Sequence, residues 1–291
     1  MSKPVSYGGQ ALIEGVMMRA PKDIAMAVRL PDGNINVERQ PIKPWSAYPV
    51  LKLPVIRGFV ALLDSLVVGM KALSYSAGMA AEGQGEEIKP FEMLLTIVVS
   101  LGLGLLLFVA LPTGMANLVK AFVPGVLLQN ILEGVLRLGI FLLYVVAISR
   151  MKDIQRVFQY HGAEHMAIFT YEEGLDLTVD NARQFTTLHP RCGTSFLLIV
   201  MVVSIVVFAF LPLGPLWLRL VSRLLAMPLV AGIAYEFLKL SGNYCKSRWF
   251  RWAIVPGLWL QKLTTSQPDD SQLEVALAAL KSIVESGQEL S

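Results

Sequence analysis

The residues best able to bind a metal ion gather in two short segments of the chain. All three histidines, His161, His165 and His189, lie within 29 residues, and Cys192 follows the last by three. Histidines four apart share one face of a helix, so both imidazoles can reach one ion. A His-x-x-Cys turn adds a nitrogen and a sulfur that suits zinc. The spacing therefore predicts a site for zinc or a similar divalent metal.

Two carboxylates are candidates for a catalytic base beside this site. Residues 161–165 read His-Gly-Ala-Glu-His, which fits the H-x-x-E-H pattern of zinc peptidases whose glutamate polarises water. Glu164 is the first candidate. Glu236 is the second, because ionisable groups in apolar helices often serve function. The structural alternatives are hydrogen-bonded core histidines, a small apolar role for Cys192, and a pair between Glu236 and Lys239.

The number of ligands separates two kinds of metal site. Four ligands from His161, His165, His189 and Cys192 would close a tetrahedral site and make the ion structural. Three protein ligands would leave a position for water, as in catalytic zinc sites. The sequence alone leaves both possibilities open.

A helix over 152–169 is expected to carry both His161 and His165, and its neighbours indicate a membrane protein. The chain is 54% hydrophobic and 16% charged, with a mean hydropathy of +0.57. Uncharged runs predict four transmembrane helices, near 93–111, 130–149, 195–212 and 220–240. The net charge of +3 is too small to indicate nucleic-acid binding. Two cysteines, Cys192 and Cys245, imply no disulfide framework.

The distribution of Lys and Arg predicts the orientation of these spans. Ten precede the first span, five lie in the 150–194 connection, and six follow from Lys239 onward. The other two connections have one each, Lys120 and Arg219. By the positive-inside rule, both termini and the His-rich connection face the cytoplasm. We expect a multi-pass protein of the cytoplasmic membrane, with the lipid bilayer as its surroundings.

The predicted fold is an α-helical integral membrane protein with a small cytoplasmic α+β head. Residues 1–90 form an N-terminal region, 91–262 the membrane domain, and 263–291 a C-terminal helix. Alternating polarity on both sides of 31–34 predicts a β-hairpin. Residues 55–73 form an amphipathic helix, and Ser271 with Glu274 fits a capping box for the last helix. The 55–73 and 271–286 surfaces could bind a membrane-protein partner.

Four segments resemble the YqhQ family of bacterial membrane proteins, which are described as predicted metal-dependent enzymes. They are Tyr7–Arg19, His161–His165, His189–Gly193 and Pro256–Asp270. The resemblance covers nearly the whole chain and implies a bacterial cytoplasmic-membrane protein. The chain departs from the family pattern at Met166, where lysine is frequent. The resemblance also draws attention to Glu14, which could contribute if the N-terminal segment folds over the site.

Two functions follow from these observations. One is a metal-dependent, hydrolase-like membrane enzyme acting on peptide or lipid. The alternative is a non-enzymatic subunit or partner of a membrane complex, in translocation or membrane biogenesis, with a structural metal or none. The ligand count distinguishes the two.

Overall fold

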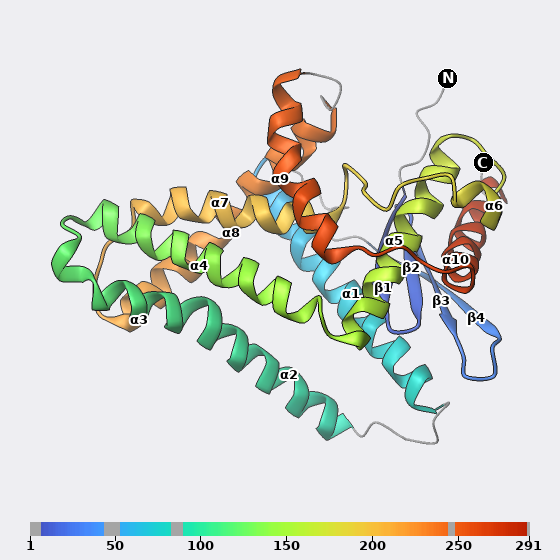
Figure 1. The fold of residues 1–291 in the computed structure, drawn as a ribbon, viewed down its shortest axis with the longest axis horizontal. Coiled ribbons are helices and arrows are strands. Elements are labelled where there is room, and N and C mark those ends of the chain that lie inside the picture. The colour runs from blue at the N-terminus through green and yellow to red at the C-terminus, as the bar shows by residue number, and fades with distance from the viewer. Residues whose placement is uncertain (1–6, 44–52, 83–89, 244–247, 290–291) are drawn as a thin grey trace.

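The structure, a computed structural model, describes residues 7–43, 53–82, 90–243 and 248–289. A small N-terminal sheet is followed by helices for the rest of the described chain (Figure 1). Cys245 lies outside the described residues.

The sheet has four antiparallel strands in the order β1-β2-β3-β4. They are β1 (Gly8–Leu12), β2 (Gly15–Arg19), β3 (Asp23–Arg29) and β4 (Ile35–Pro41). The predicted hairpin is confirmed as β3 and β4, with Arg29 opposite Ile35. Gly33 has a φ of 89° in its turn, a conformation that glycine adopts without a steric penalty. The hairpin of β1 and β2 was not predicted.

Helices cover both faces of the sheet, because its apolar side chains alternate between the faces. Val16 and Met18 pack with α5 (Lys152–Glu172) and α10 (Asp270–Glu289). Met17 and Met26 point the other way and pack against α1 (Ile56–Glu82). Helix α5, which carries two of the histidines, thus packs against the sheet from Tyr160 onward.

Helix α10 begins with a capping box, but the prediction that Ser271 and Glu274 form it is wrong. Asp269 Oδ1 accepts a hydrogen bond from the Gln272 N–H at 2.9 Å, and Gln272 Oε1 accepts from the Asp269 N–H at 2.9 Å. Glu274 instead binds Arg29. The capping box lies two residues earlier than predicted because the helix begins at Asp270, which makes Asp269 the capping residue.

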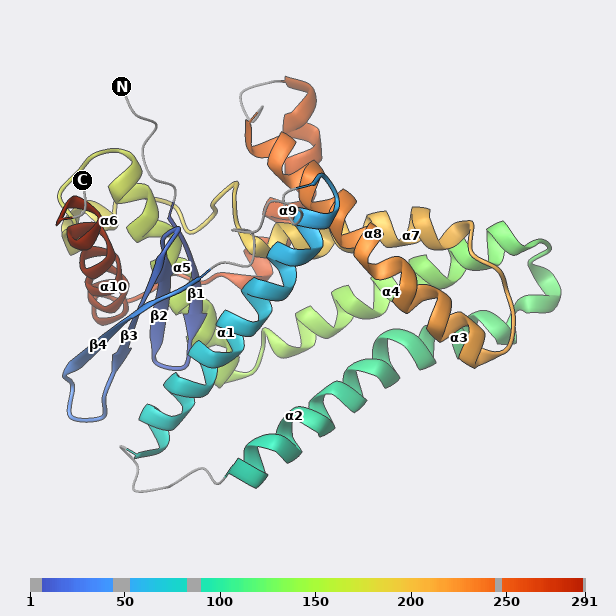
Figure 2. The same cartoon turned by 180° about the vertical axis from the view of Figure 1, so that it is seen from behind.

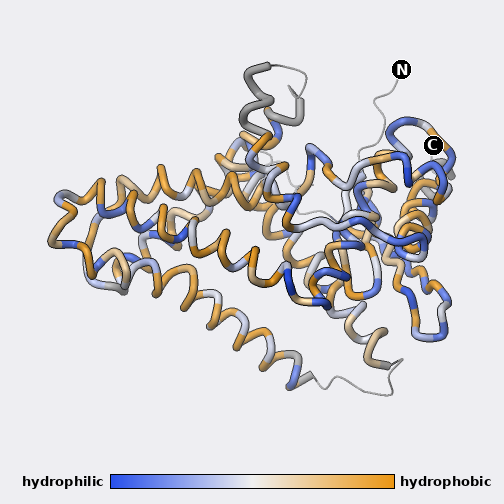
Figure 3. Tube along the Cα trace, in the orientation of Figure 1, coloured by the Kyte–Doolittle hydropathy of each residue, from blue (hydrophilic) through white to orange (hydrophobic). Residues whose placement is uncertain are grey.

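Three helical stretches are long and apolar enough to cross a membrane: Leu94–Leu118, Val126–Ile148 and Trp217–Leu240. The first comprises most of α2 (Pro90–Leu105), a π-helical turn (Leu106–Ala110) and α3 (Leu111–Leu118). The others are α4 (Val126–Ile148) and most of α8 (Leu216–Asn243). The fourth predicted span corresponds to α7 (Gly193–Ala209), which is apolar but has 17 residues. Figure 3 shows apolar residues running along these helices.

The remaining elements are a 3-10 turn (Lys120–Phe122), the short α6 (Val179–Ala182) and the longer α9 (Arg248–Thr264). Helix α7 packs between α4 and α8, and α9 crosses the start of α7. The turns from α3 to α4 and from α7 to α8 lie at the end of the helices farthest from the sheet (Figure 1). The sheet, α5 and α10 lie at the opposite end (Figure 2). That these two ends lie on opposite sides of a membrane, as the Lys and Arg counts indicate, stays a prediction.

A buried ion cluster ties the apolar helices together. Glu133 and Arg137, four residues apart on α4, form an ion pair at 2.9 Å. Arg223 from α8 binds both carboxylate oxygens of Glu133, and the Thr113 hydroxyl of α3 donates to Glu133 at 2.8 Å. A third cation, Arg219, lies 3.7 Å from Glu133. One buried carboxylate therefore holds α3, α4 and α8 together.

Candidate metal centre

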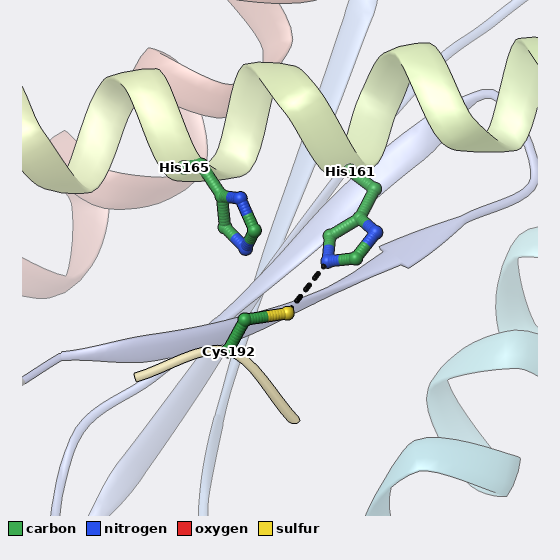
Figure 4. Close-up of side chains that lie close together, drawn as sticks. All are labelled: His161, His165 and Cys192. Atoms are coloured by element: carbon green, nitrogen blue, oxygen red, sulfur yellow. Dashed lines mark hydrogen bonds between the residues drawn. The ribbon is translucent and has the colours of Figure 1, made fainter. Parts of the chain in front are cut away.

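Three of the four predicted ligands come together. One donor atom each from His161, His165 and Cys192 lies within 4.8 Å of the other two. The histidines project from one face of α5 toward the sulfur of Cys192, which precedes α7 (Figure 4). His189 lies beside this group, with its ring centroid 5.6 Å from that of His165. We call His161, His165 and Cys192 the ligand triad.

Each histidine of the ligand triad is oriented by a backbone carbonyl. His161 Nδ1 lies 2.8 Å from the Thr264 oxygen, and His165 Nδ1 lies 2.5 Å from the Thr187 oxygen. A carbonyl only accepts, so Nδ1 carries the proton and the Nε2 lone pair is free on each ring. His161 Nε2 lies 3.2 Å from Cys192 Sγ. Metal-binding histidines have outer partners of this type, so the residues fit a metal ion.

The start of α7 positions the sulfur of Cys192. The side chain caps the helix and accepts from the Thr194 N–H at 3.4 Å, with the Thr194 hydroxyl 3.1 Å away. Free N–H groups at a helix start stabilise negative charge, and a thiolate ligand is negatively charged. Two imidazoles and one thiolate are a donor set that suits zinc.

The protonation of the neighbouring groups also agrees with metal binding. Burial lowers the pKa of His165 and of His189, so both rings favour the neutral form that binds metals. Burial raises the pKa of the Glu164 carboxyl, and the opposing effects of His161, His189 and the Gly9 N–H are smaller. Glu164 is therefore a buried acid–base group beside the ligand triad.

The position of the Glu164 side chain depends on strand β1, which approaches it closely at Gly9. A Cβ atom added at Gly9 would lie 2.8 Å from both Cγ and Cδ of Glu164. Glu164 lines the same pocket of about 580 Å³ as His161 and Cys192. The other walls of this pocket come from α1, β1, α7 and α8. We call it the triad pocket.

The buried His189 is held by its backbone. Its N–H donates to Gln261 Oε1 at 2.8 Å, and Gln261 Nε2 donates to its carbonyl at 2.9 Å. Its ring packs on Phe169 with centroids 4.5 Å apart. Within the described residues, Nε2 makes no hydrogen bond, and the nearest carboxylate oxygen, Glu172 Oε2, lies 3.5 Å away. His189 as a ligand stays a prediction.

Comparison with known proteins places the chain in a family. Residues 53–286 match the family described as "Protein of unknown function (DUF1385)". The chain belongs to this family. It is also 34% identical over 295 residues to "Uncharacterized protein YqhQ" of Bacillus subtilis (strain 168), covering 97% of this chain and 93% of that protein. The predicted membership of the YqhQ family is confirmed. No solved structure matches the chain.

Glu236, the second candidate for the catalytic base in this DUF1385 chain, forms an ion pair away from the ligand triad. Glu236 binds Arg57 of α1 through both oxygens, at 2.6 Å from Nε to Oε1. Glu236 therefore pairs with Arg57 and not with Lys239, and this ion pair joins α1 to α8. Glu14 likewise binds Arg156 and accepts from the Tyr160 hydroxyl at 3.3 Å. The N-terminal segment does fold over the site, but Gly9, not Glu14, contacts Glu164.

Several groups that contact the ligand triad, His189 or Glu164 could not be predicted from the sequence. The carbonyls of Thr187 and Thr264 belong to loop and helix-end residues that any side chain could occupy. Gln261 lies within the 256–270 segment that resembled the family, yet no metal or catalytic motif includes it. Gly9 could be recognised only from its contact with Glu164, 155 positions later in the chain.

Proposed function

We propose that the protein is a metal-dependent hydrolase of the cytoplasmic membrane, with His161, His165 and Cys192 holding a zinc-type ion. One observation carries the proposal. The three ligand atoms lie within 4.8 Å of one another, and two of the ligands, His161 and Cys192, line a pocket that Glu164 also lines. Three protein ligands leave a fourth position for water, as in catalytic zinc sites.

The residues around the triad pocket have distinct roles in this proposal. The bound ion supplies Lewis acidity to a water and to the substrate carbonyl. Glu164 accepts a proton from the water while the water oxygen forms a bond to the acyl carbon of the substrate. Glu164 then gives that proton to the leaving atom as the old acyl bond breaks. The carbonyls of Thr187 and Thr264 keep both imidazoles in the tautomer that leaves Nε2 available.

His189 has a supporting role in this proposal. Its Nε2 faces Glu172 at 3.5 Å, and its ring packs against His165 and Phe169. A fourth ligand would close the metal site and would favour the alternative, a non-enzymatic subunit with a structural ion. His189 is not among the residues whose donor atoms lie within 4.8 Å of one another, which favours the enzyme. We assign Glu236 to holding α1 against α8 through Arg57.

Membrane placement is part of the same proposal. Three helices are long and apolar enough to cross a bilayer, and α7 begins at the ligand triad. The excess of Lys and Arg in 1–92 and 150–194 supports a cytoplasmic position for both termini and for the metal site.

Complementation of a deletion strain tests the hydrolase proposal, with the amount of protein in the membrane recorded. Glu164→Gln keeps the shape of the side chain and should keep the metal, but it should abolish complementation. Glu236→Gln is the matched control on a carboxylate outside the triad pocket and should complement. Full complementation by Glu164→Gln would leave the non-enzymatic subunit as the better account.

A further inference from the structure

Strand β1 has only one neighbour in the described sheet. The order β1-β2-β3-β4 places it at one edge, next to β2 alone. Its other side faces the space between α1 and α5, both of which contact β1. An edge strand offers a row of backbone N–H and C=O groups that an added strand can bind.

The register shows which β1 residues offer those groups. Leu12 and Gly15 close the two-residue turn, and paired residues in an antiparallel hairpin alternate between bonded and non-bonded pairs. Gly9 and Ile13 therefore point away from β2. Two contacts agree: Gly9 lies closely against the Glu164 side chain, and the Ile13 N–H donates to Ser76 Oγ at 3.3 Å.

Ala11 lies midway between these two outward-pointing residues. Its N–H and C=O must therefore face the same outer side as those of Gly9 and Ile13. Within the described part of the chain, no hydrogen bond reaches either group from outside the sheet. Ala11 thus presents an unused donor and acceptor at the outer edge of β1.

This edge of β1 forms a wall of the triad pocket. Gly9 and Ala11 line it together with His161 and Glu164. Its volume of about 580 Å³ falls within the range of roughly 300–1,000 Å³ usual for ligand sites. The opposite walls are largely apolar, with leucines of α1 and α7 among them. The described lining residues include no lysine, arginine or aspartate.

We propose that the substrate is an extended polypeptide segment that adds to β1 as a fifth strand of the sheet. The inference rests on the proposed hydrolase function. The residue opposite Ala11 would exchange two backbone hydrogen bonds with it. A strand rises about 3.3 Å per residue, so the peptide bond two residues along lies beside Gly9 and Glu164. Water adds across that bond, giving a carboxylate and an amine.

The walls of the triad pocket set the preferred side chains. Leu62 and Leu66 of α1 and Leu197 of α7 face the space that the added strand occupies. Apolar side chains of the substrate are favoured there, because their burial removes apolar surface from water. A lipid substrate would use the same walls but would gain nothing from the backbone of Ala11.

The experiment measures peptide retention by the full-length protein in detergent, loaded with zinc and carrying Glu164→Gln to prevent turnover. The probe is a pool of random twelve-residue peptides, and mass spectrometry counts what is retained. Ala11→Pro removes the outward N–H and leaves the β1–β2 bonds intact, since edge strands accept proline. Ala11→Val adds similar volume and keeps the N–H. Proline should reduce retention about tenfold or more, and valine should have a much smaller effect.

A second arm does not depend on the folding of the proline variant. A matched pool with N-methylated backbone amides cannot donate to the Ala11 carbonyl, and its retention by the Ala11-containing protein should fall by a similar factor. Equal retention of both pools, equal effects of Ala11→Pro and Ala11→Val, or no retention of peptide would overturn the inference.

Two further outcomes separate this inference from the proposed function. Hydrolysis of phosphatidylglycerol vesicles by the protein with Glu164 intact, with no cleavage of peptides, would support the hydrolase and overturn the polypeptide substrate. Retention that depends on Ala11 without any cleavage by that protein would support strand addition and overturn the hydrolase.

Discussion

His161 Nε2 lies 3.2 Å from Cys192 Sγ, although the two residues are 31 positions apart in the chain. The contact joins the middle of α5 to the start of α7. Because the Thr264 carbonyl fixes His161 and the Thr194 N–H fixes Cys192, both donors already face the same point. A metal site with oriented ligands needs little rearrangement to bind its ion.

The first prediction concerns the close contact of Gly9 with Glu164. Gly9→Ala places a Cβ 2.8 Å from the Glu164 side chain and 2.8 Å from the Met17 oxygen, so Glu164 must shift. We expect the metal content to stay unchanged. The activity should fall by a factor that approaches the roughly 10²–10⁴-fold that a general base contributes. Complementation and metal analysis measure these two effects.

The matched control for this prediction is the neighbouring glycine. A Cβ at Gly8 meets nothing within 4 Å, so Gly8→Ala should behave like the unmodified protein. Equal activity of the two variants would show that the position of Glu164 does not matter.

Much of the fold could be predicted from the sequence, because the residue patterns that specify these elements are local. Asp32 and Gly33 specify the turn of the second hairpin, and the uncharged runs specify the apolar helices. The first hairpin was missed because its turn, Ile13–Glu14, has no glycine or asparagine, and Glu14 takes a φ of 53°. Favourable contacts of Glu14 with Arg156 offset the strain of that conformation.

The ligand triad was also readable, since a four-residue spacing on a helix fixes the relation of His161 to His165. The sequence could not place His189, because its orientation depends on Gln261 from a distant helix. It also could not show that Arg57, 179 residues before Glu236, is the partner of that carboxylate. Such contacts between elements depend on tertiary packing and leave no periodic signal.

A second prediction tests the support of the site by Gln261. Gln261→Met has a similar shape but leaves the N–H of His189 without a partner, while the His189 carbonyl keeps the bond from the Cys192 N–H at 3.2 Å. Each unpaired buried group costs about 1–3 kcal/mol, so the thermal unfolding midpoint in detergent should fall clearly. Gln184→Met removes an exposed hydrogen bond to Asp180 and should change little. Similar midpoints for the two variants would show that Gln261 does not stabilise this region.

A third prediction concerns the buried carboxylate between the apolar helices. Glu133→Gln removes the only negative charge that Arg137 and Arg223 bind in the described structure. Breaking a buried ion pair costs about 3–5 kcal/mol, so the protein should unfold at lower temperature or fail to accumulate in the membrane. Glu285→Gln, at an exposed position of α10, is the control. Unchanged stability of Glu133→Gln would mean that the cluster is not needed to hold the helices together.

A fourth prediction tests the orientation in the membrane. A cysteine at Glu173, which follows the C-terminal end of α5, should be protected from an impermeant thiol reagent in intact cells. A cysteine at Ala121, in the turn between α3 and α4, should react from outside. The unmodified protein reports the background from its natural cysteines, of which Cys192 is buried. The opposite labelling pattern would place the metal site outside the cytoplasm.

The most direct test of the central claim is the metal content of the purified protein, prepared without chelators, compared between ligand variants. We predict about one zinc-type ion per chain, lost in His161→Ala and Cys192→Ala but retained in Glu164→Gln and His189→Ala. That pattern would establish a three-ligand site with a position left for water. Metal at background level in the unmodified protein would contradict the account. A loss in His189→Ala as large as that in His161→Ala would show a closed four-ligand site and contradict the catalytic role.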